Sequence, residues 1–224
     1  MNVPVFKPTV LLGDSLEGLK NLEGEIFDLA LIDAPYFDYV TNHRKAGGDA
    51  KLSQSLVQQT RQDQLETVSE CIKHLKMGSA FFFYTNWQEA WWFQQKFHTF
   101  LRNEIIWDKG NWAAGDLAGS LANKYEVVFL GTKGTGWNYR GGVRIHDIWE
   151  IPRVGANRIH ATEKPVELYE KCIKIACDPG AFVFDPYAGS GSSAEAAYKC
   201  GCNFLGYDID PVYHKRILER LGKL

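Results

Sequence analysis

The segment Ile26–Tyr36, IFDLALIDAPY, constrains the fold more than any other part of the chain. Its mostly apolar run ends at a proline, which indicates a strand buried on both faces, as in a parallel sheet. Pro35 fixes its own φ and keeps Ala34 extended. Asp33 and Tyr36 therefore follow the carboxyl end of a central strand, where ligands bind in open α/β sheets. An acceptor beside an aromatic ring suits a planar ligand with an exocyclic amino group, although an ordinary strand-to-turn junction also fits these residues.

The order of strand and helix patterns predicts one α/β domain over residues 1–224. Strands are expected at 9–13, 26–33, 79–85, 102–107, 126–131, 181–185 and 203–207. Helices are expected at 16–22, 61–76, 88–100, 165–177, 191–199 and 211–221, with Gly78 ending the second of them and residues 132–160 irregular. Because strands and helices alternate, the sheet should be mostly parallel with helices on both faces.

Composition narrows the class of protein. The chain has 224 residues, of which 45% are hydrophobic and 23% charged, as expected of a globular domain. No apolar run reaches the length of a membrane span, and the amino-terminal residues do not resemble a signal peptide, so a cytoplasmic protein is expected. The five cysteines form no CxxC pair or zinc-type cluster with histidine, which favours reduced thiols and no metal site.

Charge is unevenly distributed along the chain, whose net charge is −2. Residues 38–62 hold four basic and two acidic side chains (+2), and residues 133–164 hold six basic and three acidic ones (+3). Two basic segments on an otherwise acidic protein could face a phosphate backbone. Ordinary solvated loops carry similar charges, so both interpretations stay open.

A second candidate site follows the strand at 181–185. Gly189 and Gly191 leave the turn without side chains, and a helix amino terminus follows. Asp208, 19 residues after Gly189, can accept hydrogen bonds from both hydroxyls of a ribose. Ala194 breaks the GxGxxG spacing of dinucleotide sites, which favours a cofactor with adenosine but no phosphates, such as S-adenosyl-L-methionine. Asp14, after the first strand, is then expected near the adenine.

These motifs together resemble the amino-group DNA methyltransferases with permuted motif order, the β class, which modify adenine N6 or cytosine N4. DAPY at 33–36 is similar to their catalytic motif, usually DPPY. DPYAGSGS at 185–192 is similar to DPFxGSGT, and HATEKPVELYEKCI at 160–173 to HPTQKPVxLxExxI. Comparable stretches also stand at 13–19, 104–111, 125–134 and 147–154, so the matches span nearly the whole chain in one order.

The resemblance implies a Rossmann-like fold of S-adenosylmethionine-dependent methyltransferases, a seven-stranded mostly parallel sheet with one antiparallel strand. The 26–33 and 181–185 strands would be central neighbours. The implied catalytic residues are Asp33, Ala34, Pro35 and Tyr36. The implied cofactor-binding residues are Asp14, His160, Thr162, Lys164, Pro165, Asp185, Pro186, Tyr187, Gly189, Ser190, Gly191 and Asp208.

The resemblance also implies a mechanism. The Asp33 carboxylate and the Ala34 carbonyl would accept the two N–H groups of a flipped-out base, and Tyr36 would stack on that base. Ala34 departs from the family's usual proline but keeps the carbonyl. Aspartate at position 33 favours adenine N6, with cytosine N4 as the alternative. An RNA or protein substrate and a non-catalytic DNA-binding module stay open, whereas the broken glycine spacing disfavours a nucleotide-dependent oxidoreductase.

Double-stranded DNA is the expected partner, and a homodimer is left open. Segments 37–60, 108–124 and 132–158 are the expected DNA-contacting inserts. The basic residues assigned to this contact are Arg44, Lys45, Lys51, Lys109, Arg140, Arg144, Arg153 and Arg158. Phosphate contacts of this kind hold register without reading sequence, so short or relaxed sequence specificity is expected. A solitary methyltransferase and the partner of a restriction enzyme are not distinguished.

Overall fold

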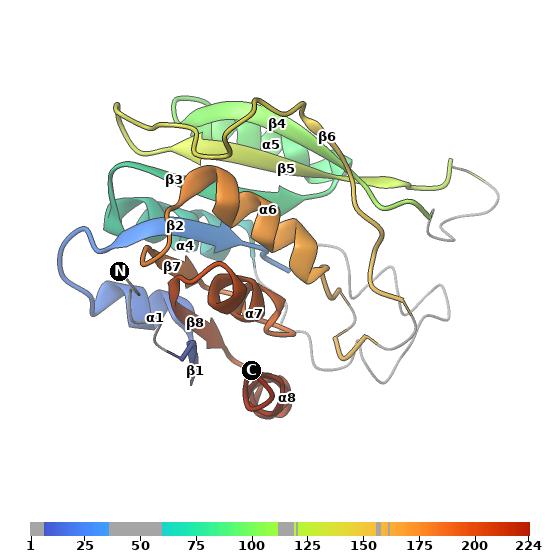
Figure 1. The fold of residues 1–224 in the computed structure, drawn as a ribbon. Helices are drawn as coiled ribbons and strands as arrows, with labels where there is room; N and C mark the ends of the chain where they lie inside the picture. Colours follow the sequence, from blue (N-terminus) through green and yellow to red (C-terminus); the bar gives the residue numbers. More distant parts are fainter. Residues whose placement is uncertain (1–6, 36–59, 112–118, 120, 156–157, 161) are drawn as a thin grey trace.

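The structure is a computed structural model, and it describes residues 7–35, 60–111, 119, 121–155, 158–160 and 162–224. Its centre is an eight-stranded sheet with the order β1-β8-β7-β2-β3-β5-β4-β6 (Figure 1). The strands are β1 (Thr9–Leu12), β2 (Phe27–Ile32), β3 (Leu75–Thr85), β4 (Leu101–Asp108), β5 (Tyr125–Thr132), β6 (Ile148–Glu150), β7 (Phe182–Asp185) and β8 (Asn203–Asp208). Strand β5 runs antiparallel to both of its neighbours, and every other pairing is parallel.

The predicted seven strands and the single antiparallel strand are confirmed, and β6 is an additional edge strand. It lies in a segment that the sequence predicted to be irregular. Three residues are too few to show a strand period, and β6 forms because it pairs with Ile106–Asp108 of β4. The Trp149 side chain, 1% exposed, packs into the core and its indole N–H donates to the carbonyl of His146.

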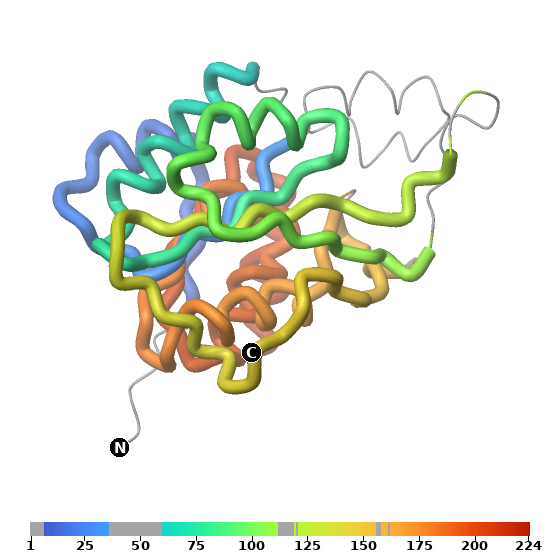
Figure 2. Tube along the Cα trace, turned by 90° about the horizontal axis from the view of Figure 1, so that it is seen from above, coloured from blue at the N-terminus to red at the C-terminus, as the bar shows by residue number. Residues whose placement is uncertain are grey.

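Helices cover both faces of the sheet. They are α1 (Ser15–Lys20), α4 (Arg61–His74), α5 (Trp87–Phe97), α6 (Val166–Ala176), α7 (Ser192–Lys199) and α8 (Pro211–Leu221). One core cluster joins α1, α4 and α5 to the sheet, and a second joins α6, α7 and α8 to its other face. In Figure 2 the blue-to-green helices and the orange helix accordingly lie on opposite sides of the sheet.

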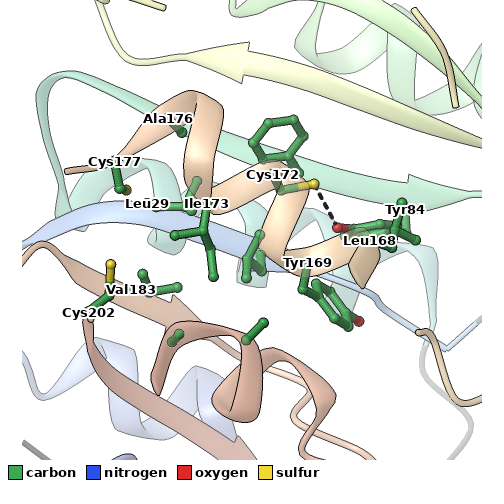
Figure 3. Close-up of a cluster of buried hydrophobic side chains, with 14 of the residues drawn as sticks. Leu29, Tyr84, Leu168, Tyr169, Cys172, Ile173, Ala176, Cys177, Val183 and Cys202 are labelled. Atoms are coloured by element: carbon green, nitrogen blue, oxygen red, sulfur yellow. Dashed lines mark hydrogen bonds between the residues drawn. The ribbon is translucent and has the colours of Figure 1, made fainter. Parts of the chain in front are cut away.

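The second core cluster, between the sheet and α6, positions the segment that precedes α6. Figure 3 shows Leu29 of β2 and Val183 of β7 facing Ile173 of α6, with the Tyr84 hydroxyl and the Cys172 thiol hydrogen-bonded at 3.1 Å. These side chains are almost fully buried. Their packing fixes α6, and with it the segment that leads into α6, against the centre of the sheet.

Helix α4 ends earlier than the sequence predicted. Its start has a capping box, in which Thr60 and Asp63 exchange hydrogen bonds. The expected end was near Lys76, but the helix stops at His74 and the chain enters β3 directly. Leu75 is fully buried and pairs with Phe27 of β2, so burial in the sheet overrides the helical pattern.

Candidate active site

Three aspartates follow the carboxyl ends of three adjacent strands. Asp208 is the last residue of β8, Asp185 is the last of β7, and Asp33 comes directly after β2. Strands β7 and β2 are parallel neighbours, as predicted, with Ala30 opposite Phe184. The chain order reverses between these two strands, so the aspartates lie at the switch point where open α/β sheets bind ligands.

The segment after β2 is held in place by α4. The Gln64 side-chain amide, 2% exposed, donates to the Pro35 carbonyl at 2.6 Å. Ala34 is also buried, and Asp33 is partly buried. The sequence motifs do not single out Gln64. Tyr36 lies outside the described residues, so its predicted stacking role remains a prediction.

Asp33 is the end of a chain of four alternating charges. The Lys164 ammonium lies 2.7 Å from Asp33 Oδ1 and 3.4 Å from Glu126 Oε2. Lys109 Nζ lies 3.3 Å from the other oxygen of Glu126. The four side chains are between 4% and 15% exposed. This charge chain connects four segments: the end of β2, the segment before α6, the start of β5 and the end of β4. They meet because β5 is antiparallel and begins at the edge where its neighbours end.

Burial and ion pairing shift the pKa values of Asp33 and Lys164 in opposite directions. Burial raises the pKa of Asp33, and the Lys164 ammonium partly opposes that rise. Burial alone would lower the pKa of Lys164, but Asp33 and Glu126 together raise it above its ordinary value. Lys164 therefore stays a cation at neutral pH, and it is the group that favours the anionic form of Asp33.

Two tyrosines border the same carboxylate. The Tyr169 hydroxyl is hydrogen-bonded to Asp33, and the Tyr84 ring centroid lies 6.0 Å from Lys164 Nζ. Burial raises the pKa of both phenols well above their ordinary values, so both remain neutral. Tyr169 is consequently a donor to Asp33.

The glycine-rich turn after β7 has the geometry that the sequence predicted for a cofactor loop. Gly189 and Gly191 have φ values of +52° and +77°, in the left-handed region that favours glycine. The Gly189 N–H donates to Asp208 Oδ2 at 2.9 Å, and the Tyr187 N–H donates to Asp185 Oδ1 at 2.8 Å. Helix α7 begins directly after Gly191, so its amino terminus faces the turn.

Burial changes the pKa values of the two aspartates that accept hydrogen bonds from this turn. Burial raises the pKa of Asp185 to about 7 and that of Asp208 to about 6. Each also accepts backbone N–H groups, which favours the anion. A carboxylate has about four lone-pair sites, so Asp208 keeps capacity to accept hydrogen bonds from a ligand beyond those from Gly189 and Asp210.

His160 lies close to Gly189 of this turn. A Cβ added to Gly189 would lie 3.7 Å from His160 Cε1 and 3.6 Å from the Tyr187 carbonyl oxygen. His160 Nδ1 accepts from the backbone N–H of Thr162 at 3.3 Å, so the ring proton is assigned to Nε2. Burial, followed by the charge of Lys164, lowers the pKa of His160 to about 4. A neutral imidazole with an Nε2–H donor therefore stands beside the glycine turn.

Helix α8 ties the His160 segment to that turn. Arg216 donates to the Ile159 carbonyl at 2.8 Å. Arg220 pairs with Glu163 at 2.8 Å and donates to the Ser190 carbonyl at 3.2 Å. The sequence motifs single out neither arginine, because their partners lie 30 and 57 residues away.

The remaining predicted cofactor residues lie at or near this edge. Asp14 follows β1, which pairs with β8 and so lies next to Asp208. Its exposed side chain caps α1 by accepting from the Leu16 N–H at 2.7 Å. Pro165 is the amino-terminal cap residue of α6, and Pro186 is buried within the glycine-rich turn.

The structure brings together only some of the basic residues assigned to DNA contact. Lys109, 11% exposed, belongs to the charge chain and is not a free surface lysine. The exposed Arg153 is close to it, since its backbone N–H donates to the Lys109 carbonyl. Arg144 is exposed before β6, and Arg158 is half-buried two residues before His160.

Arg140 lies at the other end of the sheet. It pairs with Asp178 at 2.8 Å and donates to the Ala176 carbonyl after α6. It also lines a cavity of about 220 Å³ with Asp28, which stands near the start of β2. Arg140 therefore does not share an edge with Asp33, and its assignment to DNA contact remains a prediction. Arg44, Lys45 and Lys51 lie outside the described residues, as does nearly all of the 37–60 insert.

The sheet is doubly wound, and at its switch point an aspartate lies next to a glycine-rich turn. This combination is typical of Rossmann-like α/β enzymes that bind a nucleotide-type cofactor. The arrangement places the Asp33 carboxylate, a hydrogen-bond acceptor, after the strand next to the one that leads into that turn. The chain belongs to the DNA methylase family N6_N4_Mtase, whose model matches residues 27–219. This confirms the resemblance found in the sequence motifs.

Individual relatives agree with the family. The DNA adenine methyltransferase YhdJ of Escherichia coli K12 is 23% identical over 95% of this chain and 82% of its own. Several other curated relatives are longer, and the chain spans between 32% and 70% of their length. Among solved structures, M1.HpyAVI in complex with SAM has a TM-score of 0.73 at 19% identity, covering 94% of this chain and 98% of its own. The cytosine-N4-specific PvuII DNA methyltransferase has a TM-score of 0.75 at 15% identity, covering 98% and 91%.

Within the described residues, no helix is both long enough and apolar enough to span a membrane. The same residues contain no group of three or more His, Cys, Asp or Glu side chains placed to hold a metal ion.

Proposed function

We propose that the protein transfers a methyl group from S-adenosyl-L-methionine to the N6 amino group of an adenine flipped out of double-stranded DNA. The observation that carries this proposal is the adjacency of Asp33 and the glycine-rich turn on the neighbouring strands β2 and β7. Family membership supports a DNA amino-methyltransferase. Adenine is favoured by the aspartate at position 33 and by the similarity to YhdJ.

The residues of the turn fit this cofactor. Gly189 lies close to the neutral His160, since an added Cβ would already be in van der Waals contact with that ring, so only a glycine leaves the backbone of the turn bare beside it. Asp208, at the end of β8, would bind the ribose hydroxyls, and the loop carries no basic side chain for a phosphate. When bound, S-adenosyl-L-methionine supplies an electrophilic methyl group on its sulfonium.

Asp33 would activate the acceptor amine. An exocyclic amine is a weak nucleophile because its lone pair is delocalised into the ring. A hydrogen bond from its N–H to the Asp33 carboxylate, and a second to the Ala34 carbonyl, would localise the lone pair on nitrogen. Holding the amine next to the donor accounts for much of the acceleration. No cysteine is required, and burial keeps Cys71 and Cys172 as neutral thiols by raising their pKa.

The first experiment incubates the protein with tritiated S-adenosyl-L-methionine and unmethylated DNA, followed by nucleoside analysis. Label in N6-methyladenine that is lost in Asp33→Ala supports the proposal. Asp178→Ala is the matched control, because it removes an exposed, ion-paired aspartate at the other end of the sheet. Absence of label on DNA, with cofactor binding retained, contradicts DNA as the substrate and redirects the search to RNA or protein.

Cytosine N4 is the second candidate for the acceptor. The structural similarity to the cytosine-N4-specific PvuII enzyme supports it. The Asp33 chemistry is the same for either amine, so label in N4-methylcytosine would keep the mechanism and overturn the base.

The rest of the proposal concerns DNA contact. The inserts 37–60, 108–124 and 132–158, with Arg144, Arg153 and Arg158 among their basic residues, would lie along the phosphate backbone. We also propose a cytoplasmic location, which a fusion to a fluorescent protein would test. A homodimer is tested by sedimentation of the full chain.

A further inference from the structure

The lysine of the HATEKP motif has a different environment from the rest of that motif. His160 faces the glycine-rich turn, whereas the Lys164 ammonium points at the carboxylates of Asp33 and Glu126. Its side chain is only 4% exposed. The sequence resemblance implies that both residues bind the cofactor. In the structure His160 lies beside the glycine-rich turn, whereas Lys164 contacts Asp33.

The contacts leave Lys164 little freedom. Its 2.7 Å contact with Asp33 Oδ1 is a charge-assisted hydrogen bond. Glu126, 3.4 Å away on β5, holds the same ammonium from another side, and Lys109 pairs with Glu126 in turn. A buried lysine with two carboxylate partners from two strands is oriented by the fold, which a solvated lysine is not.

We propose that Lys164 is a positioning residue for Asp33, which orients the carboxylate and keeps it ionised so that it can accept an N–H of the target amine. This inference rests on the proposed function. Lys164 occupies Oδ1, and Tyr169 supplies a second donor. With about four lone-pair sites on a carboxylate, Asp33 keeps capacity to accept from the amine.

The charges around Asp33 determine what each substitution does. Besides Lys164, the titratable groups that face it are Glu126 of β5, Tyr169 of α6, Tyr84 of β3 and Asp185 of β7. Lys164 lowers the pKa of Asp33, and Glu126 raises it. Removing one or the other charge should therefore move the titration of Asp33 in opposite directions.

The test compares Lys164→Gln, Lys164→Arg and Glu126→Gln in the full chain. The first readout is the carboxyl ¹³C titration of Asp33 by NMR, which needs no turnover. The second is the pH profile of single-turnover methyl transfer to DNA, and the third is the Kd for S-adenosyl-L-methionine. Lys133→Gln is the matched control, because Lys133 also pairs with a carboxylate, that of Glu25, but at the far end of β5.

We expect Lys164→Gln to move the Asp33 titration and the acidic limb of the rate profile upward by about one pH unit or more. Lys164→Arg should restore most of the wild-type profile, and Glu126→Gln should shift it downward. The Kd for the cofactor should change by less than about threefold, a free-energy change of under 1 kcal/mol. Lys133→Gln should leave the profile unchanged.

An unchanged Asp33 titration in Lys164→Gln would overturn the inference. So would a rise in the cofactor Kd without a shift of the acidic limb, since that result makes Lys164 a cofactor ligand. If Lys164→Gln does not fold, the double variant Lys164→Gln/Glu126→Gln is compared with Glu126→Gln: an Asp33 titration that is higher in the double variant supports the inference, and equal titrations overturn it. Failure of the wild-type protein to methylate DNA would contradict the proposed function alone, because the NMR titration still tests Lys164.

Discussion

Replacing Gly189 by alanine should weaken cofactor binding without unfolding the protein. The residue has φ +52°, and an alanine in the left-handed region costs about 1–2 kcal/mol. Its Cβ would lie 3.6 Å from the Tyr187 carbonyl oxygen and 3.7 Å from His160, which are ordinary van der Waals distances. The cost to stability is therefore the backbone term alone. The methyl group would, however, cover the bare backbone of the turn, which we propose the cofactor approaches closely.

Gly24 offers a matched control for this substitution. It has φ +78°, with nothing within 4 Å of an added Cβ, and lies before the amino end of β2. Gly24→Ala carries the same kind of backbone strain away from the proposed site. Both variants should lose about 1–2 kcal/mol in urea denaturation. Only Gly189→Ala should raise the Kd for S-adenosyl-L-methionine, by about tenfold, measured by isothermal titration calorimetry.

Two results would contradict this prediction for Gly189→Ala. Equal cofactor affinity in Gly189→Ala and Gly24→Ala would remove the turn from the cofactor site. A loss of stability in Gly189→Ala far greater than in Gly24→Ala would show that the added methyl clashes within the protein.

Two further predictions concern the stability of the site. Arg220→Met should lower the free energy of unfolding by about 1.5–3 kcal/mol, because the charged hydrogen bonds to Glu163 and Glu195 are lost; an unchanged urea midpoint would contradict the role of α8 as an anchor. Asp185 has a pKa raised to about 7 by burial, so its native form binds more protons than its unfolded form, and its contribution to stability falls as pH rises from about 4 to above 7. Asparagine resembles the protonated acid. The free energy of unfolding of Asp185→Asn, measured in urea, should therefore increase by about 2–4 kcal/mol relative to that of the wild type as the pH rises from 5 to 8. A difference that stays constant over this pH range would contradict the raised pKa of Asp185.

Local patterns in the sequence predict some elements of this fold, whereas other elements depend on contacts between distant residues. The strands around Leu29 and Val183 were recognised because a buried strand appears in the sequence as a continuous apolar run. Gly189 and Gly191 are predicted as parts of a ligand loop because glycines leave the turn without side chains, and their left-handed φ values come from the structure. Strand β6 and the true end of α4 were not predicted, since each depends on pairing with a partner strand and has no period of its own.

Apolar runs, glycines and short motifs are local signals, so the order of the elements, the family and the pair of loops at the proposed site can be predicted from the amino-acid sequence. Which charges meet depends on the packing of the strands. Lys164 contacts Asp33 across 131 residues of sequence, and Glu126 joins them because β5 runs antiparallel and begins at the edge where β2 ends. Arg140, close in sequence to basic residues on the same segment, is carried to the far end of the sheet. A charge's partner depends on how the strands pack, and no local pattern encodes that arrangement.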